Sequence, residues 1–422
     1  MKRKKTIATK RLHVLLLVLL LLTTTESRAT TITVSNPTPL QRHEVVEVPW
    51  WGDKAQSVTV RDVFGIAQPC QLTHDGRLLI FVSVRPNGKA TYTVSEGSST
   101  ATEGNSTATE GNSTATRPWV AMGYHPERMD DIVIENDRGG YRFYGPALQR
   151  SGQRGYGIDL WLKNSSEMVV DSLYRLHFSQ LAKIDSLRKK GLRREADSVY
   201  NQTSFHLNHG RGMDCYNVGP TLGCGAPSLM QGDELLFPWC YERYEVLDNG
   251  PLRITLRLDF VPVSRPSLSE QPVAEHRIVT LDRGSNFCRM QVWYTGLTRP
   301  ANVCSGFVIH DADTVSVICG PDYIHYADPT DAPLRQNCQI YVAALYPDGI
   351  DRIRRLMYDK PKGGNAGHTI GIHRGLKDGE VFTYYFGAAW SQYDVRSQAE
   401  WQLRIQDFLT CRHQPLTVSI QP

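Results

Sequence analysis

Short segments rich in β-branched and aromatic residues, separated by turn residues, recur along most of this 422-residue chain. Several alternate apolar and polar residues with a period of two, which is typical of half-buried strands. Helical segments do not alternate with them, and this argues against a parallel sheet built from strand–helix–strand units. The sequence therefore predicts a mainly β protein with an antiparallel sandwich. The clearest strand segments are 57–63, 78–84, 90–94, 252–260, 277–281, 287–294, 339–345 and 381–390.

One long stretch, residues 169–199, departs from the strand pattern. Its apolar residues recur at helical spacing between charged ones, as in Leu173, Leu176, Leu181, Ile184 and Leu187. Gly191 near the middle predicts either two helices or a kink. We expect a helical insertion at about residues 169–200 in a sheet protein, and a second helix late in the chain over residues 399–409.

The start of the chain has the three-part order of a secretory signal peptide. A positive segment, residues 1–5, precedes the apolar run Leu12–Leu22 and the short polar stretch Thr23–Ala29. The apolar run is about half of the roughly 20 residues that a membrane span needs. We predict cleavage near Ala29, with an uncleaved N-terminal anchor as the alternative.

Two further features refine the prediction of export. Seven of the 47 basic residues and one of the 43 acidic residues lie in the signal segment, so the remainder is slightly acidic and offers no basic face for nucleic acid. The first of nine cysteines is Cys70, so no lipid-acceptor cysteine follows the signal. We expect a soluble secreted or periplasmic protein without a stable membrane anchor. Cys215 and Cys224 could pair, or stay as buried free thiols.

The mature chain divides into three parts by composition. Residues 30–95 predict a small N-terminal β region with tight turns. Residues 96–117 hold the repeat EGSSTAT, EGNSTAT, EGNSTAT, which cannot bury enough apolar surface to fold and predicts a linker or exposed loop. Residues 118–422 carry the remaining strands and the helical insertion.

The densest group of chemically active residues lies in the Gly-rich segment 205–225. His206 and His209 are candidates for acid and base near neutral pH, and Tyr216 for a second proton carrier. Arg211 offers a fork that matches a carboxylate, and Asp214 completes the candidate binding set. Two alternatives stay open. His206, His209 and Asp214 could hold a divalent metal, although we favour no metal and no cofactor, or the segment is a surface loop with hydrogen-bonded histidines.

A second polar group precedes this segment. Glu135, Asp137, Arg138, Arg142 and Tyr144 are crowded into ten residues. Glu135 and Asp137 would share one face of a strand and could act as paired carboxylates, or form ion pairs with the arginines. Glu135 and Arg142 are kept as candidate substrate-binding residues.

Tryptophans provide candidate sugar platforms. Trp161 lies between Asp159 and Lys163 on one predicted strand face, and Trp390 ends another strand. A tryptophan beside polar groups can stack on a sugar ring, but the same pattern is common in sheet cores. His276, His310 and His368 are further polar candidates that no spacing singles out.

Several motifs in fixed order resemble the domain-of-unknown-function family numbered 4861, whose members are exported proteins, many of them from Bacteroidetes. The resemblance spans nearly the whole mature chain. It implies a β-supersandwich similar to galactose mutarotase and a setting among genes for pectin and other uronic-acid polysaccharides, but assigns no residue a role. The motifs are Glu135-Asn-Asp-Arg, Tyr144-Gly-Pro-Ala-Leu, Gly157-Ile-Asp-Leu-Trp-Leu-Lys, His209-Gly-Arg-Gly-Met-Asp-Cys-Tyr-Asn-Val-Gly, Leu222-Gly-Cys-Gly, Leu281-Asp-Arg-Gly-Ser-Asn and Tyr384-Tyr-Phe-Gly-Ala-Ala-Trp.

The residues and the resemblance together predict an exported carbohydrate-active protein. We expect an enzyme that acts on uronic-acid-containing, pectin-type oligosaccharides by lyase, hydrolase or epimerase chemistry. The first alternative is a binding protein of a polysaccharide-utilisation system, with Trp161, Trp239 and Trp390 as platforms. The second is a structural or assembly protein. An oligosaccharide is the expected partner, and the oligomeric state is left open.

Overall fold

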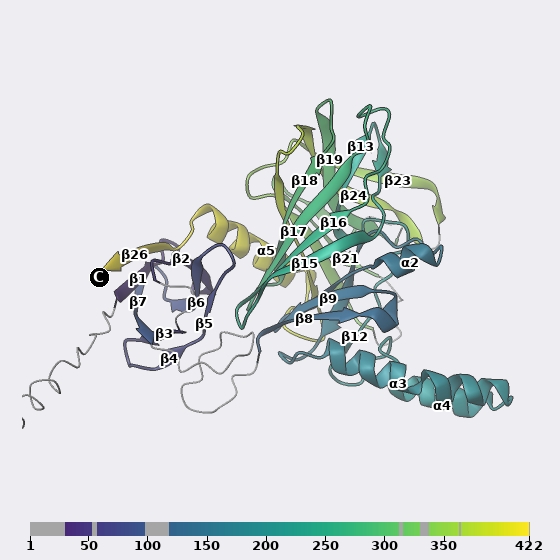
Figure 1. Cartoon of the computed structure of the whole chain (residues 1–422), viewed down its shortest axis with the longest axis horizontal. Helices are drawn as coiled ribbons and strands as arrows, with labels where there is room; N and C mark the ends of the chain where they lie inside the picture. Colours follow the sequence, from purple (N-terminus) through teal and green to yellow (C-terminus); the bar gives the residue numbers. More distant parts are fainter. Residues whose placement is uncertain are drawn as a thin grey trace, which may run out of the picture.

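The chain folds into two β units joined by a long helix (Figure 1). The computed structural model describes residues 30–52, 57–97, 118–311, 315–329, 337–362 and 364–421. The predicted signal peptide and the repeat after Gly97 lie outside these residues. The described strands form five sheets, and neighbouring strands pair antiparallel throughout. The predicted mainly β, antiparallel supersandwich with a helical insertion is confirmed.

The N-terminal unit packs a five-stranded sheet, in the order β26-β1-β7-β3-β4, on a three-stranded sheet, in the order β2-β6-β5. Alternate residues such as Ile32, Val34 and Val48 face inward and form its core. The strands are β1 (Thr30–Ser35), β2 (Arg42–Pro49), β3 (Ser57–Asp62), β4 (Ala67–Gln68), β5 (Cys70–Leu72), β6 (Arg77–Val84), β7 (Lys89–Gly97) and β26 (Thr417–Gln421).

The last strand corrects the predicted division of the chain. Residues 118–422 were expected to form one sandwich domain, but β26 pairs with β1, as Figure 1 shows for the yellow and purple strands. The pairing covers what would otherwise be an open sheet edge, and Val418 packs against the N-terminal core. The two ends of the described chain therefore complete one sheet.

The larger unit is a sandwich of two sheets. A five-stranded sheet, in the order β14-β13-β19-β24-β23, faces an eight-stranded sheet, in the order β15-β16-β17-β18-β25-β22-β21-β20. Leu256, Val279, Met290, Val303 and Ile370 are among the fully buried residues of the shared core. The strands are β13 (Cys224–Gln231), β14 (Glu234–Leu236), β15 (Tyr241–Asn249), β16 (Arg253–Phe260), β17 (Ala274–Asp282), β18 (Phe287–Thr295), β19 (Ala301–Ile309), β20 (Val317–Cys319), β21 (Tyr323–Asp328), β22 (Ile340–Leu345), β23 (Arg352–Lys362), β24 (Asn365–Leu376) and β25 (Phe382–Trp390).

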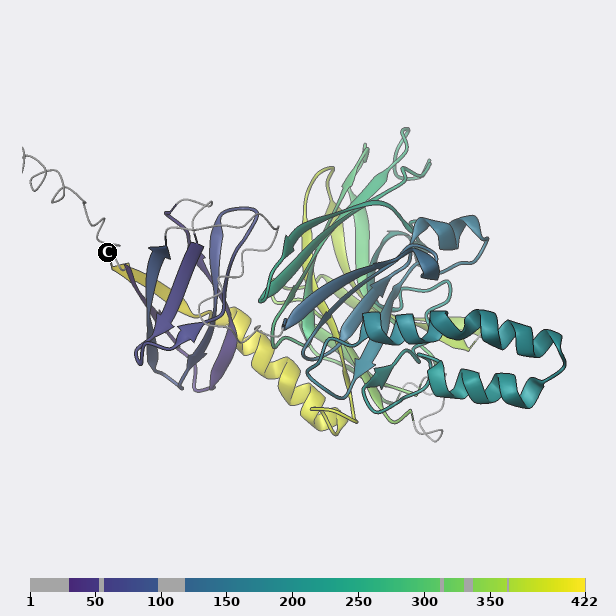
Figure 2. The same cartoon turned by 60° about the horizontal axis from the view of Figure 1, so that its bottom comes forward.

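A third sheet, in the order β12-β11-β10-β9-β8, lies beside the sandwich and carries a helical hairpin (Figure 2). The predicted insertion is confirmed as two helices, and Gly191 adopts a positive φ of 76° in the turn between them. Trp161, Tyr174 and Phe205 pack between helix and sheet. The elements are β8 (Val120–His125), η1 (Pro126–Arg128), β9 (Asp131–Asn136), β10 (Gly140–Phe143), α2 (Pro146–Arg150), β11 (Ile158–Lys163), α3 (Val170–Lys189), α4 (Arg193–Thr203) and β12 (Gly212–Met213).

The predicted late helix is confirmed as α5 (Gln398–His413), which runs from the sandwich to the N-terminal unit (Figure 2). The Ser397 side chain accepts a hydrogen bond from the backbone N–H three residues further on, which caps the helix start. Trp401, Ile405 and Leu409 recur at a spacing of four residues, so they share one face and bury it against the eight-stranded sheet.

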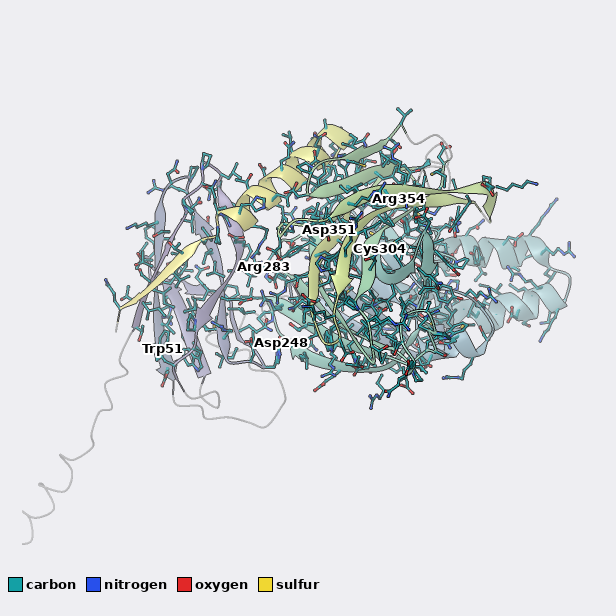
Figure 3. All side chains as sticks on the ribbon, turned by 90° about the horizontal axis from the view of Figure 1, so that it is seen from above. Trp51, Asp248, Arg283, Cys304, Asp351 and Arg354 are labelled. Atoms are coloured by element: carbon teal, nitrogen blue, oxygen red, sulfur yellow. The ribbon has the colours of Figure 1, made fainter. Side chains whose placement is uncertain are left out.

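The two units meet through polar contacts. Asp248 accepts a hydrogen bond from the His74 backbone N–H at 2.7 Å, and Gln71 binds the backbone of Arg253. Arg283 lies over an aromatic ring of the N-terminal unit, 3.9 Å from its centre. Figure 3 shows Asp248 and Arg283 on the side of the sandwich that faces this unit. These contacts fix the orientation of the units.

Cysteines and hydrophobic segments add two findings. None of the nine cysteines, which all lie within the described residues, forms a disulfide, so the Cys215–Cys224 bond that the sequence left open is not formed. Burial holds the pKa of the Cys224 thiol well above its usual range, which keeps it neutral. Within the described ranges, no helix combines the length and the apolar composition that a membrane crossing requires.

A buried ion pair anchors the helical hairpin to the third sheet. The Glu135 carboxylate is 2.8 Å from the Lys163 ammonium, and it accepts hydrogen bonds from the N–H groups of Val169 and Val170. The carboxylate thus fills the N-terminus of α3, where the helix dipole favours a negative charge. Of the two alternatives for this polar group, the Glu135–Asp137 carboxylate pair does not form, because β9 ends at Asn136 and Asp137 accepts a hydrogen bond from another backbone N–H. Within the described residues Glu135 forms an ion pair instead, with Lys163 and not with an arginine.

Removal of the Glu135 carboxylate should destabilise the protein strongly. Glu135→Ala leaves the Lys163 ammonium, which is fully buried, without its charge partner, and it uncaps α3. We expect a loss of about 3–5 kcal/mol in the free energy of unfolding by urea titration. Arg354→Ala, which breaks an exposed ion pair with Asp233, should cost about 1 kcal/mol or less. Equal losses in the two variants would contradict the anchoring role of Glu135.

Candidate functional site

The Gly-rich segment singled out in the sequence connects two groups of buried polar side chains. Near its middle Asp214 joins the arginine cluster, which consists of Arg142, Asp131, Asp159 and Asp214. Further along, the segment supplies Asn217 to the histidine site, which consists of His310, Asp328, His368 and Asn217. Leu222 contacts His368 of this site through its backbone N–H. The segment therefore brings together side chains from the third sheet and from both sheets of the sandwich.

The arginine cluster follows from strand register. Arg142 on β10 stands directly opposite Asp159 on β11, and the two form an ion pair. Asp131 lies two residues before the β9 partner of Arg142, so it points to the same face, 3.6 Å from the guanidinium. Asp214 enters from the Gly-rich segment at 2.7 Å.

Three carboxylates surround Arg142, and Arg128 lies 4.0 Å from one of them, Asp131, so the cluster has a surplus of negative charge. Burial raises the pKa of Asp131 to about 6, against the lowering effect of Arg142, and it also raises the pKa of Asp214. The Tyr174 hydroxyl accepts a hydrogen bond from Arg142 at 3.1 Å. With Arg142 only 3% exposed, this cluster positions the chain and offers no open face to a ligand.

The histidine site closes one end of the sandwich. His310 follows the last residue of β19, and its Nδ1 lies 2.9 Å from both carboxylate oxygens of Asp328 on β21 in the facing sheet. Its Nε2 lies 2.6 Å from the backbone carbonyl of Asn217. Both ring nitrogens thus face acceptors, and only the protonated imidazolium can donate to both. A buried carboxylate beside it stabilises that charge.

A second histidine lies beside the first. His368 on β24 is opposite Val308 in the sheet and 1% exposed. Burial, with a smaller effect of His310, lowers the pKa of His368 to about 3, so the ring is neutral. Its Nε2 accepts from the Leu222 N–H, which assigns the proton to Nδ1, 3.3 Å from the Tyr358 hydroxyl. The site thus combines a neutral imidazole with a second imidazole whose two ring nitrogens both face acceptors.

Tyr216 lies between the two groups. Its ring meets His310 edge-on with a centroid distance of 5.4 Å. Burial holds the pKa of Tyr216 well above its usual range, and the negative charge of Asp328 acts in the same direction. A phenol held neutral in this way can donate a hydrogen bond, but it gives up its proton less readily than an ordinary tyrosine.

Aromatic rings extend outward from the histidine site. Phe237 lies 6.2 Å from His368, and Tyr156 stacks on Phe237 at 5.3 Å. Trp239 contacts Tyr156 edge-on and is 39% exposed. We call these three residues the aromatic group. Trp239 thus presents an exposed ring that the rings of Tyr156 and Phe237 separate from His368, and an exposed tryptophan ring is suited to stacking on a sugar.

The predicted catalytic histidines of the Gly-rich segment lie on its exposed first part. His206 Nδ1 is 2.9 Å from the backbone carbonyl of Asp214, and His209 Nε2 is 2.9 Å from that of Ser204. Arg211 is partly exposed nearby. Within the described residues no hydrogen bond or ring contact joins these side chains to His310, and no group of three or more His, Cys, Asp and Glu side chains is arranged to hold a metal ion. Their catalytic roles stay predictions.

The other predicted site residues lie in the interior. Trp161 and Trp390 are 1% and 2% exposed, so neither presents a ring face for stacking, and only Trp239 among the proposed platforms does. Glu135 binds Lys163, and Arg142 is enclosed by carboxylates. These side chains are packed in the interior, and their contact with substrate stays a prediction.

Sequence reasoning named His310 and His368 but did not select them, and it missed Asp328 and Asn217. The reason is distance along the chain. Asn217 is 93 residues from His310, and Leu222 is 146 residues from His368. Sheet pairing and sandwich packing bring them together, and no local spacing encodes that meeting.

The fold and the site define an antiparallel β-sandwich protein with a buried histidine–carboxylate pair at one end of the sandwich. The chain belongs to the family described as Domain of unknown function (DUF4861), whose model matches residues 34–418. The resemblance expected from the motifs is thereby confirmed. A relative, "Uncharacterized protein P7" of Formosa agariphila, is 25% identical over 306 residues, which cover 70% of this chain and 68% of the relative.

Solved structures give a more distant likeness. An α-mannosidase from Enterococcus faecalis V583 matches with a TM-score of 0.39 and 11% identity, over 93% of this chain and 46% of the mannosidase. A glycosyl hydrolase family 38 protein from Enterococcus faecalis matches with a TM-score of 0.40 and 11% identity, over 93% and 47%. The chain spans about half the length of these structures, and likeness at this level says nothing about activity.

The surplus charge of the arginine cluster predicts a stabilising substitution. The folded-state pKa of Asp131, about 6, exceeds the ordinary value of 3.8, so the folded chain binds more protons between these values and loses stability as pH rises through them. Asp131→Asn removes this loss and leaves Arg142 two carboxylates. We expect a gain of about 2–3 kcal/mol near pH 7 and little gain near pH 4, measured by urea unfolding.

The exposed carboxylate Asp233 provides the matched control. Asp233→Asn should change the free energy of unfolding by about 1 kcal/mol or less at either pH. A destabilised Asp131→Asn variant near pH 7 would show that Arg142 needs the Asp131 charge.

Proposed function

We propose that this protein is an exported carbohydrate-active enzyme that acts on uronic-acid-containing oligosaccharides by proton transfer at the histidine site. The observation that carries the proposal is the position of His310, held between the Asp328 carboxylate and the Asn217 carbonyl, with the aromatic group next to its neighbour His368. Lyase, hydrolase and epimerase chemistry all require a proton donor or acceptor held against a sugar ring.

The hydrogen bonds of His310 suit a general acid. Asp328 orients the ring through Nδ1 and stabilises the imidazolium. The Nε2 proton is donated to the Asn217 carbonyl, and a substrate oxygen that displaces this carbonyl would receive it. His368 is neutral in its fixed tautomer, so it adds no second positive charge there.

Recognition of the sugar would use the aromatic group and an arginine. Trp239 offers an exposed ring face. Arg211, partly exposed on the Gly-rich segment, stays the predicted clamp for the uronate carboxylate. The pectin-type substrate itself rests on the family resemblance.

The activity test compares the two histidine pairs. We expect turnover of saturated or unsaturated pectin oligosaccharides, followed by ultraviolet absorbance, reducing ends and anomer composition by NMR. His310→Ala and Asp328→Asn should each lower kcat/KM by about a hundredfold or more. The exposed double variant His206→Ala/His209→Ala is the matched control and should retain activity. Full activity of folded His310→Ala, with loss in the double variant, would move the chemistry to the Gly-rich segment.

A binding protein is the second candidate, and the edge-on contact of Tyr156 with the exposed Trp239 favours it. Affinity for oligosaccharides without turnover, abolished in Trp239→Ala and unchanged in His310→Ala, would replace the enzyme proposal with this one.

Export is a separate part of the proposal and rests on the sequence. Strand β1 begins at Thr30, directly after the predicted cleavage position. When the full chain is expressed in a bacterium with two membranes, we expect mass spectrometry of the periplasmic fraction to give a mature N-terminus within a few residues of Thr30. An intact N-terminus in the membrane fraction would favour the uncleaved anchor.

A further inference from the structure

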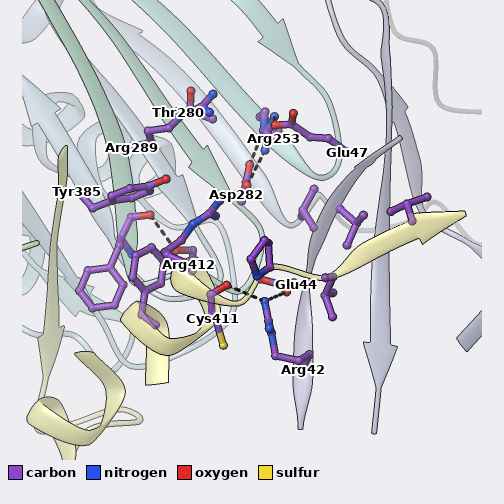
Figure 4. A pocket seen from close by; sticks show the side chains of 18 residues that line it. Arg42, Glu44, Glu47, Arg253, Thr280, Asp282, Arg289, Tyr385, Cys411 and Arg412 are labelled. Atoms are coloured by element: carbon purple, nitrogen blue, oxygen red, sulfur yellow. Dashed lines mark hydrogen bonds and ion pairs between the residues drawn. The ribbon is translucent and has the colours of Figure 1, made fainter. Parts of the chain in front are cut away.

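A charged cleft lies where the N-terminal unit, the eight-stranded sheet and the end of α5 meet (Figure 4). Its volume is about 270 Å³, close to the lower end of the roughly 300–1,000 Å³ of typical ligand pockets. A cleft of this volume can hold one small ligand or one ring of a longer ligand. Its lining includes four arginines and three carboxylates, contributed by β2, β16, β17, β18 and α5.

Two of the arginines are used to hold the walls together. Arg253 forms ion pairs with Glu47 of the N-terminal unit at 2.5 Å and with Asp282 of the sandwich at 2.6 Å. Arg42 forms an ion pair with Glu44 and donates to a backbone carbonyl just beyond α5 at 3.0 Å. Arg253 and Arg42 thus form ion pairs with all three carboxylates that line the cleft.

Within the part of the chain that the structure describes, the other two arginines of the cleft have no carboxylate as an ion-pair partner. Arg289 and Arg412 line the cleft, and among the described residues neither guanidinium has a hydrogen bond or an ion pair. Arg412 lies 5.6 Å from the centre of the Tyr385 ring. One guanidinium comes from the sheet and one from the helix end, so these two guanidiniums without ion pairs reach the cleft from different walls. With four arginines and three carboxylates, the lining carries a net charge of about +1.

Strand register aligns three of the lining residues. Thr280 on β17 stands opposite Arg289 on β18, which stands opposite Tyr385 on β25. Directly opposed residues point to the same face of a sheet, so the three side chains form a row toward the cleft, as Figure 4 shows. Thr280 is 4% exposed, and its hydroxyl has no hydrogen-bond partner. A buried hydroxyl without a partner is costly unless a ligand satisfies it.

We propose that this cleft is a second saccharide site that binds one ring of an acidic sugar through its oxyanion. Arg289 and Arg412 hold the carboxylate or sulfate, and Thr280 donates a hydrogen bond to it. Tyr385, whose ring packs edge-on against Phe408 at 5.0 Å, forms an aromatic wall for the ring. The choice of a sugar rests on the proposed function, whereas the oxyanion site rests on the charges alone.

The binding test uses the mature chain and defined probes. Calorimetric titrations are made with galacturonic acid, a sulfated galactose, galactose and inorganic sulfate. At least one acidic sugar should bind about tenfold or more tightly than galactose and than inorganic sulfate. Comparison of the titrations with galacturonic acid and with the sulfated galactose identifies whether the site binds a carboxylate or a sulfate. Equal binding of galactose, or of inorganic sulfate alone, overturns the acidic-sugar site.

Single substitutions then locate the bound ring. Arg289→Gln, Arg412→Gln and Thr280→Val remove donors that form no hydrogen bond or ion pair among the described residues, so the fold should tolerate them. Each of the arginine variants should raise the Kd of the acidic sugar about tenfold or more, which corresponds to about 1.4 kcal/mol. Arg374→Gln, on β24 of the other sheet, removes an exposed positive charge and should leave Kd unchanged within about twofold. Unchanged affinity in both cleft arginine variants refutes the site.

The same variants separate this inference from the proposed function. His310→Ala should abolish turnover and leave calorimetric binding in the cleft intact. Cleft variants should weaken binding while a short substrate that fills only the histidine site is still turned over. Absence of turnover in every protein, with the arginine effects on Kd preserved, would refute the enzyme and keep the saccharide site.

Discussion

The arrangement of the larger unit depends on the ion pairs of Arg142. This one guanidinium binds carboxylates from three different parts of the chain, at the start of β9, on β11 and in the Gly-rich segment after β12. Breaking the Arg142–Asp214 pair would leave buried charge without its partner, so the segment has little freedom to leave. The Gly-rich segment is held at Asp214, and the residues that follow bring the Asn217 carbonyl against His310 and the Leu222 N–H against His368.

A comparable constraint joins the two units. Arg253 links Glu47 to Asp282, and Arg42 reaches from β2 to the chain just beyond α5. The closing strand β26 also belongs to the N-terminal sheet although it is the end of the chain. The cleft between the units is thus formed by walls in fixed positions, and a preorganised site loses little entropy when a ligand binds.

Local patterns predicted the elements well and the site only in part. Leucine spacing identified α3, because residues three and four apart lie on the same face of a helix. Gly191 identified the turn before α4, because glycine adopts a positive φ without steric cost. Crowding of polar residues pointed to the Gly-rich segment, which does connect the polar groups. The same crowding suggested His206 and His209, whose ring nitrogens face nearby backbone carbonyls. Composition could not tell a buried tryptophan such as Trp161 from an exposed one such as Trp239.

The sequence by itself determined the mainly β fold class, the helical insertion, the late helix and the family, since each is encoded in local periodicity or in motifs along the chain. Tertiary structure alone decided which charges meet. His310 finds Asp328 across the sandwich, and Thr280, Arg289 and Tyr385 align across three strands. Those encounters depend on register and sheet packing, which bring together residues far apart in the chain, and one sequence carries no local signal of such pairings.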